Sequence, residues 1–323
     1  MTRIARILLL TVATALLPLT ANAAYLSLYA FGDSLSDAGN VFEATGHTYP
    51  YPSGRFGDGP VAVEQLATNL GIAGFRASLL GGTDYAWGGA QTGPDIFGGS
   101  DNFLTYSGLG ALAGTGIEAQ VHNFTTAPPS FDPASSLFFV WGGANDFFAA
   151  GLFDPTRAPE VAANAVANLA NEIALLAGAG AQHFLVPNLP DLGITPDGAA
   201  SPYSAQLTLV SMGFNSALES ALDGIRTGYG VDIREYNVFG LLHEVKDDPL
   251  KFGFANVTDP CVDGSSVCAN PDKYLFWDSV HPTTAADAIL AARFAATVPE
   301  PGTVALLGVG LLGLTLSRRR LKR

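Results

Sequence analysis

Short apolar runs alternate with longer helical segments along most of this chain, and this alternation limits the folds that it can adopt. Five runs predict strands: residues 25–31, 83–93, 137–141, 182–187 and 231–236. Six segments predict helices: residues 60–70, 117–126, 159–177, 202–229, 237–246 and the stretch after Pro282 to about Ala296. Strands that alternate with helices pair in parallel, with helices over both faces of the sheet. The sequence therefore predicts a three-layer α/β/α fold with a mostly five-stranded parallel sheet.

The composition is that of a globular protein with a large core. The chain has 323 residues, of which 48% are hydrophobic and 14% charged. No internal repeat or linker divides residues 24–297, which we expect to form one domain. That stretch holds 9 basic and 28 acidic residues. A body of this charge repels nucleic acid and anionic membrane surfaces, and it suits neutral substrates.

The first 23 residues have the layout of a signal peptide. Arg3 and Arg6 precede an apolar run, and Ala21-Asn22-Ala23 is a small-x-small cleavage site. An uncleaved membrane anchor is the alternative, but the run is short and the cleavage site is present. We therefore predict an exported bacterial protein that signal peptidase cleaves near Ala24.

Residues 298–323 carry a second targeting pattern. A Pro-Glu-Pro triplet precedes an apolar run shorter than the ~20 residues that span a bilayer, and a basic cluster follows it. This order resembles the PEP-CTERM sorting signal of exopolysaccharide-producing bacteria. The resemblance implies transient membrane association of the segment as a transmembrane helix, processing by a sorting protease of the exosortase type, and a cell-surface or extracellular location. A plain C-terminal anchor is the alternative.

The chain has two cysteines, Cys261 and Cys268. They lack the second pair that a zinc site needs, and in an exported protein we predict a disulfide between them. Nearby acidic residues could indicate calcium or simply a solvated loop that the disulfide closes, and we favour the loop: Asp259, Asp263 and Asp272. The sequence therefore predicts neither a metal nor a cofactor.

Glycine-bearing turns follow three predicted strands, after residues 31, 87 and 141. Ligands of open parallel sheets bind at the carboxyl ends of the strands, so these turns are expected to form one site. Ser34 lies in the first turn, just after Gly32. There its hydroxyl clears the sheet, and backbone N–H groups point at whatever it attacks. A serine hydroxyl stays protonated at neutral pH, so it needs a base and a group that orients the base.

His281 is the candidate base. It lies in a loop before the last predicted helix, and Asp278 is three residues upstream, close enough to fold back onto one ring nitrogen. The other histidines lie in a loop, on predicted helix surfaces or in a strand: His47, His122, His243 and His183.

Four blocks of this chain resemble, in order, those of the GDSL (SGNH) esterases and lipases. They are Gly32-Asp33-Ser34-Leu35-Ser36-Asp37, Gly88-Gly89, Gly143-x-Asn145-Asp146 and Asp278-x-x-His281. The stretches Gly54-Arg55-Phe56-x-x-Gly59-Pro60 and Phe276-Trp277-Asp278-x-x-His281-Pro282-Thr283 are most similar to the secreted branch with bacterial phospholipase/acyltransferase-type and plant members. The resemblance covers residues 28–283.

This resemblance implies a flavodoxin-like sheet and a role for each block. Ser34 is the nucleophile, His281 the base, and Asp278 orients His281. The oxyanion hole consists of the Ser34 N–H, a glycine N–H and the Asn145 amide. Alignment of the second block favours Gly89 over Gly88 as the glycine donor. The family usually has Asn where this chain has Asp84, a departure that concerns local hydrogen bonding.

Aromatic and basic residues near these blocks are candidates for a substrate groove, or for simple loop packing: Tyr51, Arg55, Phe56 and Trp87. Three carboxylates beside the blocks are expected to be structural. Asp33 and Asp37 cap the serine turn, and Asp146 braces the loop of Asn145.

Three functions remain open. The first is a secreted serine esterase or lipase that acts through an acyl-serine. The second is an esterase that removes acetyl groups from extracellular polysaccharide, which the sorting segment motivates. The third is a non-catalytic surface or matrix protein, which the retention of all four blocks disfavours.

Overall fold

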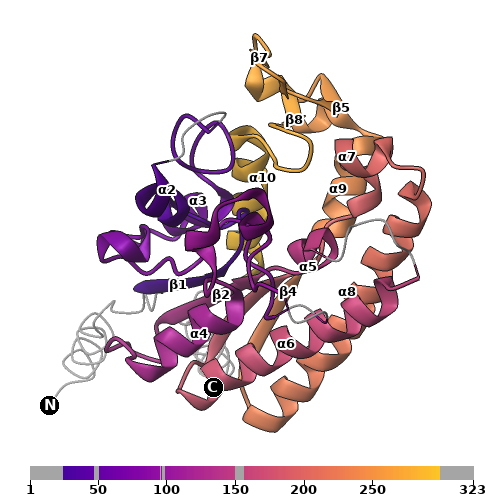
Figure 1. The fold of residues 1–323 in the computed structure, drawn as a ribbon. Helices are drawn as coiled ribbons and strands as arrows, with labels where there is room; N and C mark the ends of the chain where they lie inside the picture. Colours follow the sequence, from indigo (N-terminus) through magenta and orange to yellow (C-terminus); the bar gives the residue numbers. More distant parts are fainter. Residues whose placement is uncertain (1–24, 47–50, 95, 97–98, 150–155, 299–323) are drawn as a thin grey trace, which may run out of the picture. The chain divides into compact units, whose positions relative to one another are not determined.

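The computed structural model describes residues 25–46, 51–94, 96, 99–149 and 156–298 (Figure 1). The predicted signal peptide, the C-terminal sorting segment and His47 lie outside the described residues. Residues Leu26–Val298 pack together as one unit.

A parallel sheet of four strands runs through this unit in the order β1-β2-β3-β4. The strands are β1 (Ser27–Gly32), β2 (Ser136–Trp141), β3 (His183–Pro187) and β4 (Asp232–Tyr236). Their register pairs Ser27 with Ser136 and His183 with Leu137 and Asp232. All six residues of β2 are buried, because helices cover both faces of this central strand.

The predicted fifth strand, residues 83–93, is reduced to an extended segment beside the free edge of β1. The N–H of Ala30 donates to Thr83 O (3.1 Å), and the N–H groups of Tyr85 and Trp87 donate to Ala30 O and Gly32 O. Asp84 forms an isolated parallel bridge with Ala30. With this segment at the edge, the order is that of a flavodoxin-like sheet, and the chain crosses over between β1 and β2.

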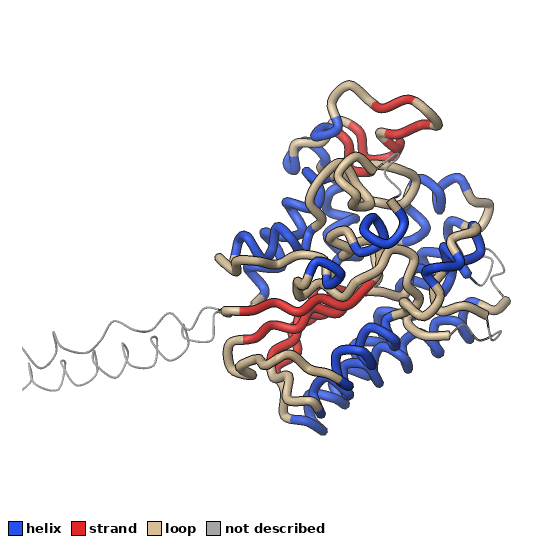
Figure 2. The backbone as a smooth tube through the Cα atoms, turned by 60° about the vertical axis from the view of Figure 1, so that its left-hand side comes forward, coloured by secondary structure: helices blue, strands red, loops and turns tan. Residues whose placement is uncertain are grey.

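Helices form a layer on each face of the sheet (Figure 2). One layer contains α4 (Ile117–Thr126), α6 (Ala158–Gly178) and α8 (Ser204–Tyr229). The other contains α3 (Ala62–Asn69), α9 (Val238–Asp247) and α10 (Thr284–Thr297). Three short helices lie in the loops: α2 (Asn40–Thr45), α5 (Ala144–Ala149) and α7 (Pro196–Ala200). The α/β/α prediction is confirmed.

An aromatic cluster fills the space between the sheet and the layer of α4 and α6. Phe31 and Phe138 stack in parallel with ring centroids 6.5 Å apart, and Phe124 of α4 packs edge-on against both. All three rings are fully buried, and such pairs add stability beyond the apolar area that they bury. α6 packs its buried residues into this core. Among the described residues it is the one helix long and apolar enough to cross a membrane, by length and composition only.

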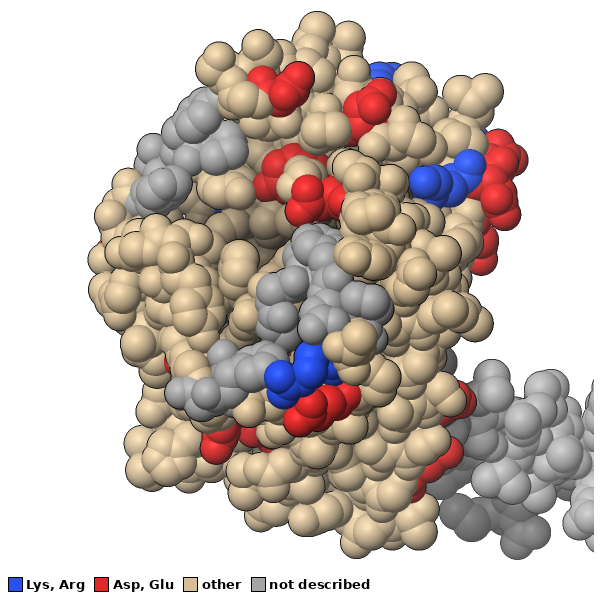
Figure 3. All heavy atoms as spheres, turned by 45° about the vertical axis from the view of Figure 1, so that its right-hand side comes forward, with Lys and Arg blue, Asp and Glu red and all other residues tan. Residues whose placement is uncertain are grey.

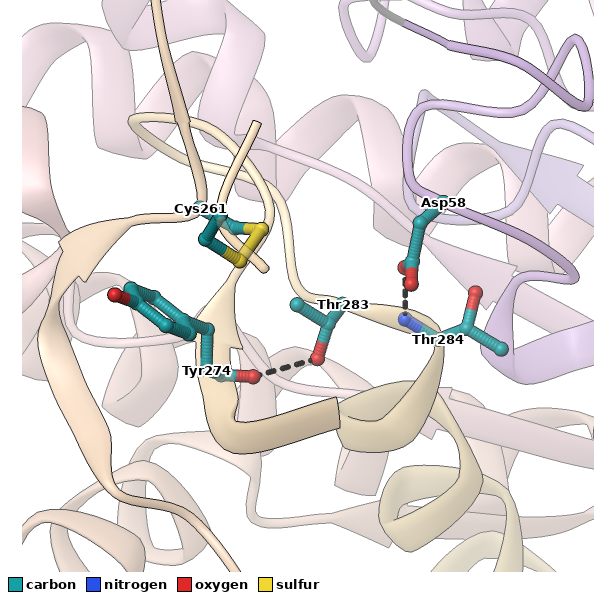
Figure 4. Close-up of a disulfide and its surroundings, with 6 residues drawn as sticks. Asp58, Cys261, Tyr274, Thr283 and Thr284 are labelled. Atoms are coloured by element: carbon teal, nitrogen blue, oxygen red, sulfur yellow. Dashed lines mark hydrogen bonds between the residues drawn. A yellow bond between two sulfur atoms is a disulfide. The ribbon is translucent and has the colours of Figure 1, made fainter. Parts of the chain in front are cut away.

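A small β region precedes α10 and carries the disulfide (Figure 4). It contains the parallel pair β5 (Asn256–Pro260) and β8 (Tyr274–Phe276), and the hairpin of β6 (Val262–Asp263) and β7 (Ser266–Val267). A disulfide joins Cys261 to Cys268 across the base of this hairpin.

The chain between β8 and α10 is fixed by hydrogen bonds from several directions. Cys261 N–H and Val262 N–H donate to Phe276 O and Trp277 O. The Thr283 hydroxyl donates to Tyr274 O (2.7 Å), and Thr284 N–H donates to Asp58 (2.7 Å), as Figure 4 shows. The loop of Asp278 and His281, which lies between these contacts, is thereby held at both of its ends.

Candidate active site

Ser34 lies in a tight turn immediately after β1. Gly32 ends the strand where a Cβ atom would lie 2.4 Å from Trp141 O of β2, so the close approach of the two strands requires glycine. The N–H groups of Ser36 and Asp37 then donate to Asp33 O, which closes the turn. The Ser34 side chain faces a pocket at the carboxyl ends of the strands.

The histidine and the aspartate of the last block reach Ser34 through side-chain hydrogen bonds. His281 Nε2 lies 2.8 Å from Ser34 Oγ, and His281 Nδ1 lies 2.7 Å from Asp278 Oδ2. Asp278 Oδ1 accepts from the N–H groups of Val280 and His281, and Oδ2 also accepts from the Tyr51 hydroxyl (3.0 Å). The structure thus brings together three side chains whose residues span 247 positions of the chain.

These contacts shift the pKa values of both partners. Burial disfavours the charge of Asp278, but the charge of His281 and its hydrogen bonds outweigh burial and lower the pKa of Asp278 to about 2. Burial also disfavours protonated His281, but Asp278 and, more weakly, Asp33 outweigh burial and raise the pKa of His281. Asp33 itself is buried, which raises its pKa to about 6.

These shifts predict a pH dependence. A histidine accepts a proton only when it is neutral, so we expect activity to fall as the pH drops through the pKa of His281, which lies above the ordinary value of about 6.5. In Asp33→Asn one of the two raising charges is removed, while the side-chain oxygen that accepts from Leu35 N–H remains. We expect the acidic midpoint of kcat/KM against pH to move to lower pH in this variant. Asp197→Asn, at another pocket carboxylate, is the control, and equal shifts in the two variants would contradict the role of Asp33.

The second block contributes one of its two glycines to the serine pocket. Gly88 N–H donates to the buried carboxylate of Asp37 (2.8 Å), so it is already engaged. Gly89 lines the pocket, and its φ of +77° favours glycine. Gly89 O accepts from Phe103 N–H (2.8 Å), which fixes the turn. Within the described part of the chain, the N–H groups of Ser34 and Gly89 donate to no protein acceptor.

Asn145 lies in the first turn of α5, after β2, and also lines the pocket. Its Nδ2 donates to Ala90 O (3.0 Å), which leaves its second N–H for another acceptor. Next to it, Asp146 accepts from both the N–H (3.0 Å) and the hydroxyl (2.6 Å) of Thr92. Asp146 therefore ties α5 to the segment that follows Gly89.

Two further buried carboxylates connect the blocks. Asp37 accepts from three N–H groups at the start of α2 as well as from Gly88. Asp84 accepts from the N–H groups of Ala38 (2.6 Å) and Ala86 (3.1 Å), so both of its partners are donors and a carboxylate fits the position. Burial, and for Asp84 the charge of Asp37, raises the pKa of both groups.

The pocket at Ser34 has a volume of about 430 Å³. Of the residues predicted for a groove, Tyr51 and Phe56 line it, together with Phe103, Leu104 and Phe148, whose individual positions the sequence did not identify.

Carboxylates predominate over basic side chains on the face shown in Figure 3, as the acidic composition predicts.

Two groove predictions do not match the structure. Arg55 turns away and pairs with Glu64 through two nitrogens, at 2.7 and 3.1 Å. It lines a separate pocket of about 340 Å³ beside the first. Trp87 packs against the hydrophobic core. In the extended segment its side chain shares a face with Tyr85, which stacks on Phe31, because side chains two apart point the same way.

The segment that follows β3 forms one wall of the Ser34 pocket, which the sequence patterns did not predict. Pro190, Leu192, Thr195 and Asp197 line the pocket. Its position could have indicated this role, because the segment follows the carboxyl end of a parallel strand next to β2, and ligands of such sheets bind at these strand ends.

The other predicted polar groups lie elsewhere. His122 is exposed on α4, and His183 begins β3. His243 is half-exposed on α9, and its Nε2 contacts the buried Asp191 at 2.9 Å. Within the described residues, no group of three His, Cys, Asp or Glu side chains is arranged to hold a metal ion.

A serine, a histidine and an aspartate in hydrogen-bonded series at the switch point of a parallel sheet are typical of serine hydrolases. The chain belongs to the GDSL-like lipase/acylhydrolase family, whose model matches residues 28–294. A second model, the PEP-CTERM protein-sorting motif, matches residues 297–320 and indicates export.

Curated relatives include the thermolabile hemolysin of Vibrio parahaemolyticus, 28% identical over 82% of this chain and 62% of the hemolysin. A GDSL esterase/lipase of Arabidopsis thaliana is 26% identical over 82% of this chain and 85% of the plant protein. Esterase EstA of Pseudomonas aeruginosa is 29% identical over 94% of this chain and 51% of the esterase. The chain therefore spans about half to two thirds of these bacterial relatives.

Proposed function

We propose that this protein is a serine esterase that hydrolyses carboxylic esters through an acyl-enzyme on Ser34. The hydrogen-bonded series of Asp278, His281 and Ser34 carries the proposal. A base that contacts a hydroxyl on one side and an orienting carboxylate on the other is what acyl transfer needs. Membership of a lipase/acylhydrolase family supports the same reaction class.

In the first half of the proposed reaction, Ser34 Oγ attacks the carbonyl carbon of the ester and its proton passes to His281 Nε2. The carbonyl oxygen becomes an oxyanion, which accepts from the N–H groups of Ser34 and Gly89 and from Asn145 Nδ2. Asp278 stabilises the imidazolium that forms. The C–O bond to the alcohol then breaks, the alcohol oxygen takes the proton from His281, and the acyl group remains on Ser34.

In the second half, water attacks the carbonyl carbon of acyl-Ser34 and gives one proton to His281 Nε2. The bond between the acyl carbon and Ser34 Oγ breaks, and Oγ takes that proton back. The products are a carboxylic acid, an alcohol and the free enzyme, and no cofactor enters the balance. An alcohol in place of water gives acyl transfer by the same steps.

The proposed oxyanion hole predicts the effect of Asn145→Ala. Removal of one such donor lowers kcat by about 10²- to 10³-fold, because the donor acts on charge that develops in the transition state. We expect a loss of this size with little change in KM, measured by steady-state kinetics on a p-nitrophenyl ester. Asn145→Asp, of equal size but with an acceptor in place of the donor, should lose at least as much. A kcat within threefold of wild type would remove Asn145 from the hole.

We also propose how the chain is processed. Residues 1–23 serve as a signal peptide, residues 24–297 as the hydrolase domain, and residues 298–323 as a segment that an exosortase-type protease handles at the membrane. Because this segment resembles the sorting signal of exopolysaccharide-producing bacteria, an O-acetylated extracellular glycan is a second candidate substrate class. Acetyl and longer acyl esters differ in the space that they need beside Ser34.

A fluorophosphonate probe tests the proposed nucleophile directly, since it reacts preferentially with activated serines. We expect one probe per chain by intact mass, located by peptide mapping on Ser34. Labelling should be lost in His281→Ala, because the Ser34 hydroxyl then has no base beside it. Absence of labelling, or labelling at another serine, would contradict the proposal.

A further inference from the structure

A second cavity lies beyond the Ser34 pocket, between α9, α10 and β8. It has a volume of about 80 Å³, and its far wall consists of Leu241, Leu242 and Val245 of α9 with Ile289 and Leu290 of α10. We refer to it as the apolar cavity. None of these five residues lines the Ser34 pocket.

The polar side chains that line the apolar cavity are already hydrogen-bonded. The Thr195 hydroxyl donates to Leu192 O (3.0 Å) and accepts from Gly198 N–H (3.1 Å). Trp141 Nε1 donates to Asn188 O (3.1 Å). A sugar or a water molecule would find few hydrogen-bond partners there, whereas a hydrocarbon chain needs none.

The apolar cavity adjoins the reacting atoms. Leu35, Pro190, Thr195 and Val280 line both it and the Ser34 pocket. Leu35 follows the nucleophile directly, and Val280 directly precedes His281. An acyl chain that leaves an ester carbonyl at Ser34 toward this side of the pocket meets these four residues first and the apolar cavity next.

We propose that the apolar cavity binds the acyl chain of the ester and selects acyl groups of about six to eight carbons. The proposal rests on the esterase function proposed above. A cavity of about 150 Å³ accommodates benzene, so 80 Å³ has room for about three or four further carbons beyond those at the neck. The acyl chain thus lies under α9 and α10, and the alcohol remains on the side of Tyr51 and Phe56.

Two substitutions of Val245 test the proposal. Val245 is buried and lines the apolar cavity, and it lines neither the Ser34 pocket nor the pocket of Arg55. Each methylene group that enters the cavity is expected to raise kcat/KM about fourfold, so wild type should prefer p-nitrophenyl octanoate to acetate by at least 50-fold. Val245→Phe should cut this preference at least tenfold and leave acetate unchanged. Val245→Ala should move the optimum to longer chains.

The neighbouring pocket that Arg55 lines supplies a matched control. Leu109→Phe narrows that pocket instead, and we expect it to leave the chain-length preference as in wild type. A preference for acetate in wild type, an unchanged profile in both Val245 variants, or a shift in Leu109→Phe alone would overturn the acyl assignment while leaving the esterase intact. Absence of Ser34-dependent hydrolysis with every ester would instead overturn the proposed function.

Discussion

Replacing Ser34 with alanine is expected to lower kcat for ester hydrolysis by about 10⁵- to 10⁶-fold. The proposed reaction needs an oxygen at this position to form the acyl-enzyme, and no other hydroxyl is hydrogen-bonded to His281 in the described structure. What activity remains should come from the oxyanion donors and substrate binding alone. The measurement is kcat on a p-nitrophenyl ester, with the unfolding temperature as a check that the variant is folded.

Ser36 supplies the matched control two residues away. It is fully buried, and its hydroxyl makes no hydrogen bond within the described residues. Ser36→Ala should therefore retain nearly all activity and stability. Wild-type rates in Ser34→Ala, or an equal loss in the two variants, would show that the reaction does not proceed through Ser34.

Asp278→Asn is the second substitution with a large expected effect, a loss of about 10⁴-fold in kcat. The asparagine Nδ2 would face His281 Nδ1 and force that nitrogen to accept. The ring proton would then lie on Nε2, where it blocks proton transfer from Ser34. The overall geometry should persist, because the asparagine oxygen can still accept from the N–H groups of Val280 and His281.

Tyr51→Phe separates this effect from simple loss of a hydrogen bond. The Tyr51 hydroxyl donates to the same carboxylate oxygen that contacts His281. Its removal leaves the charge and the tautomer in place, so we expect a loss of less than tenfold in kcat. Similar losses in Tyr51→Phe and Asp278→Asn, compared under the same conditions, would argue against control of the histidine tautomer.

Much of the layered fold could be predicted because its elements carry a strong local pattern. The helix predicted over 117–126 has the same bounds in the structure, and the strand predicted over 137–141 gains one residue, Ser136. The prediction of a full strand over residues 83–93 was wrong. The N–H groups of Ala86 and Gly88 donate to the carboxylates of Asp84 and Asp37 instead of to a neighbouring strand.

The candidate site was predictable to the extent that each block has its own sequence pattern. Patterns do not say which way a loop side chain turns, and so Arg55 and Trp87 were placed in the groove. Glu64, nine residues after Arg55, is the partner that draws the guanidinium away. No local sequence pattern indicates the apolar cavity, because its wall consists of residues from α9, α10 and β8, which only tertiary packing brings together.

The disulfide hairpin couples the order of the loop that carries Asp278 to export of the protein. The hairpin donates backbone hydrogen bonds to Phe276 and Trp277, the two residues before Asp278. Its covalent closure forms in oxidising compartments and not in the cytoplasm, where thiols are kept reduced. We therefore expect the nascent chain to hold its catalytic loop less firmly than the exported one. The proposed esterase would then reach its full activity only after export.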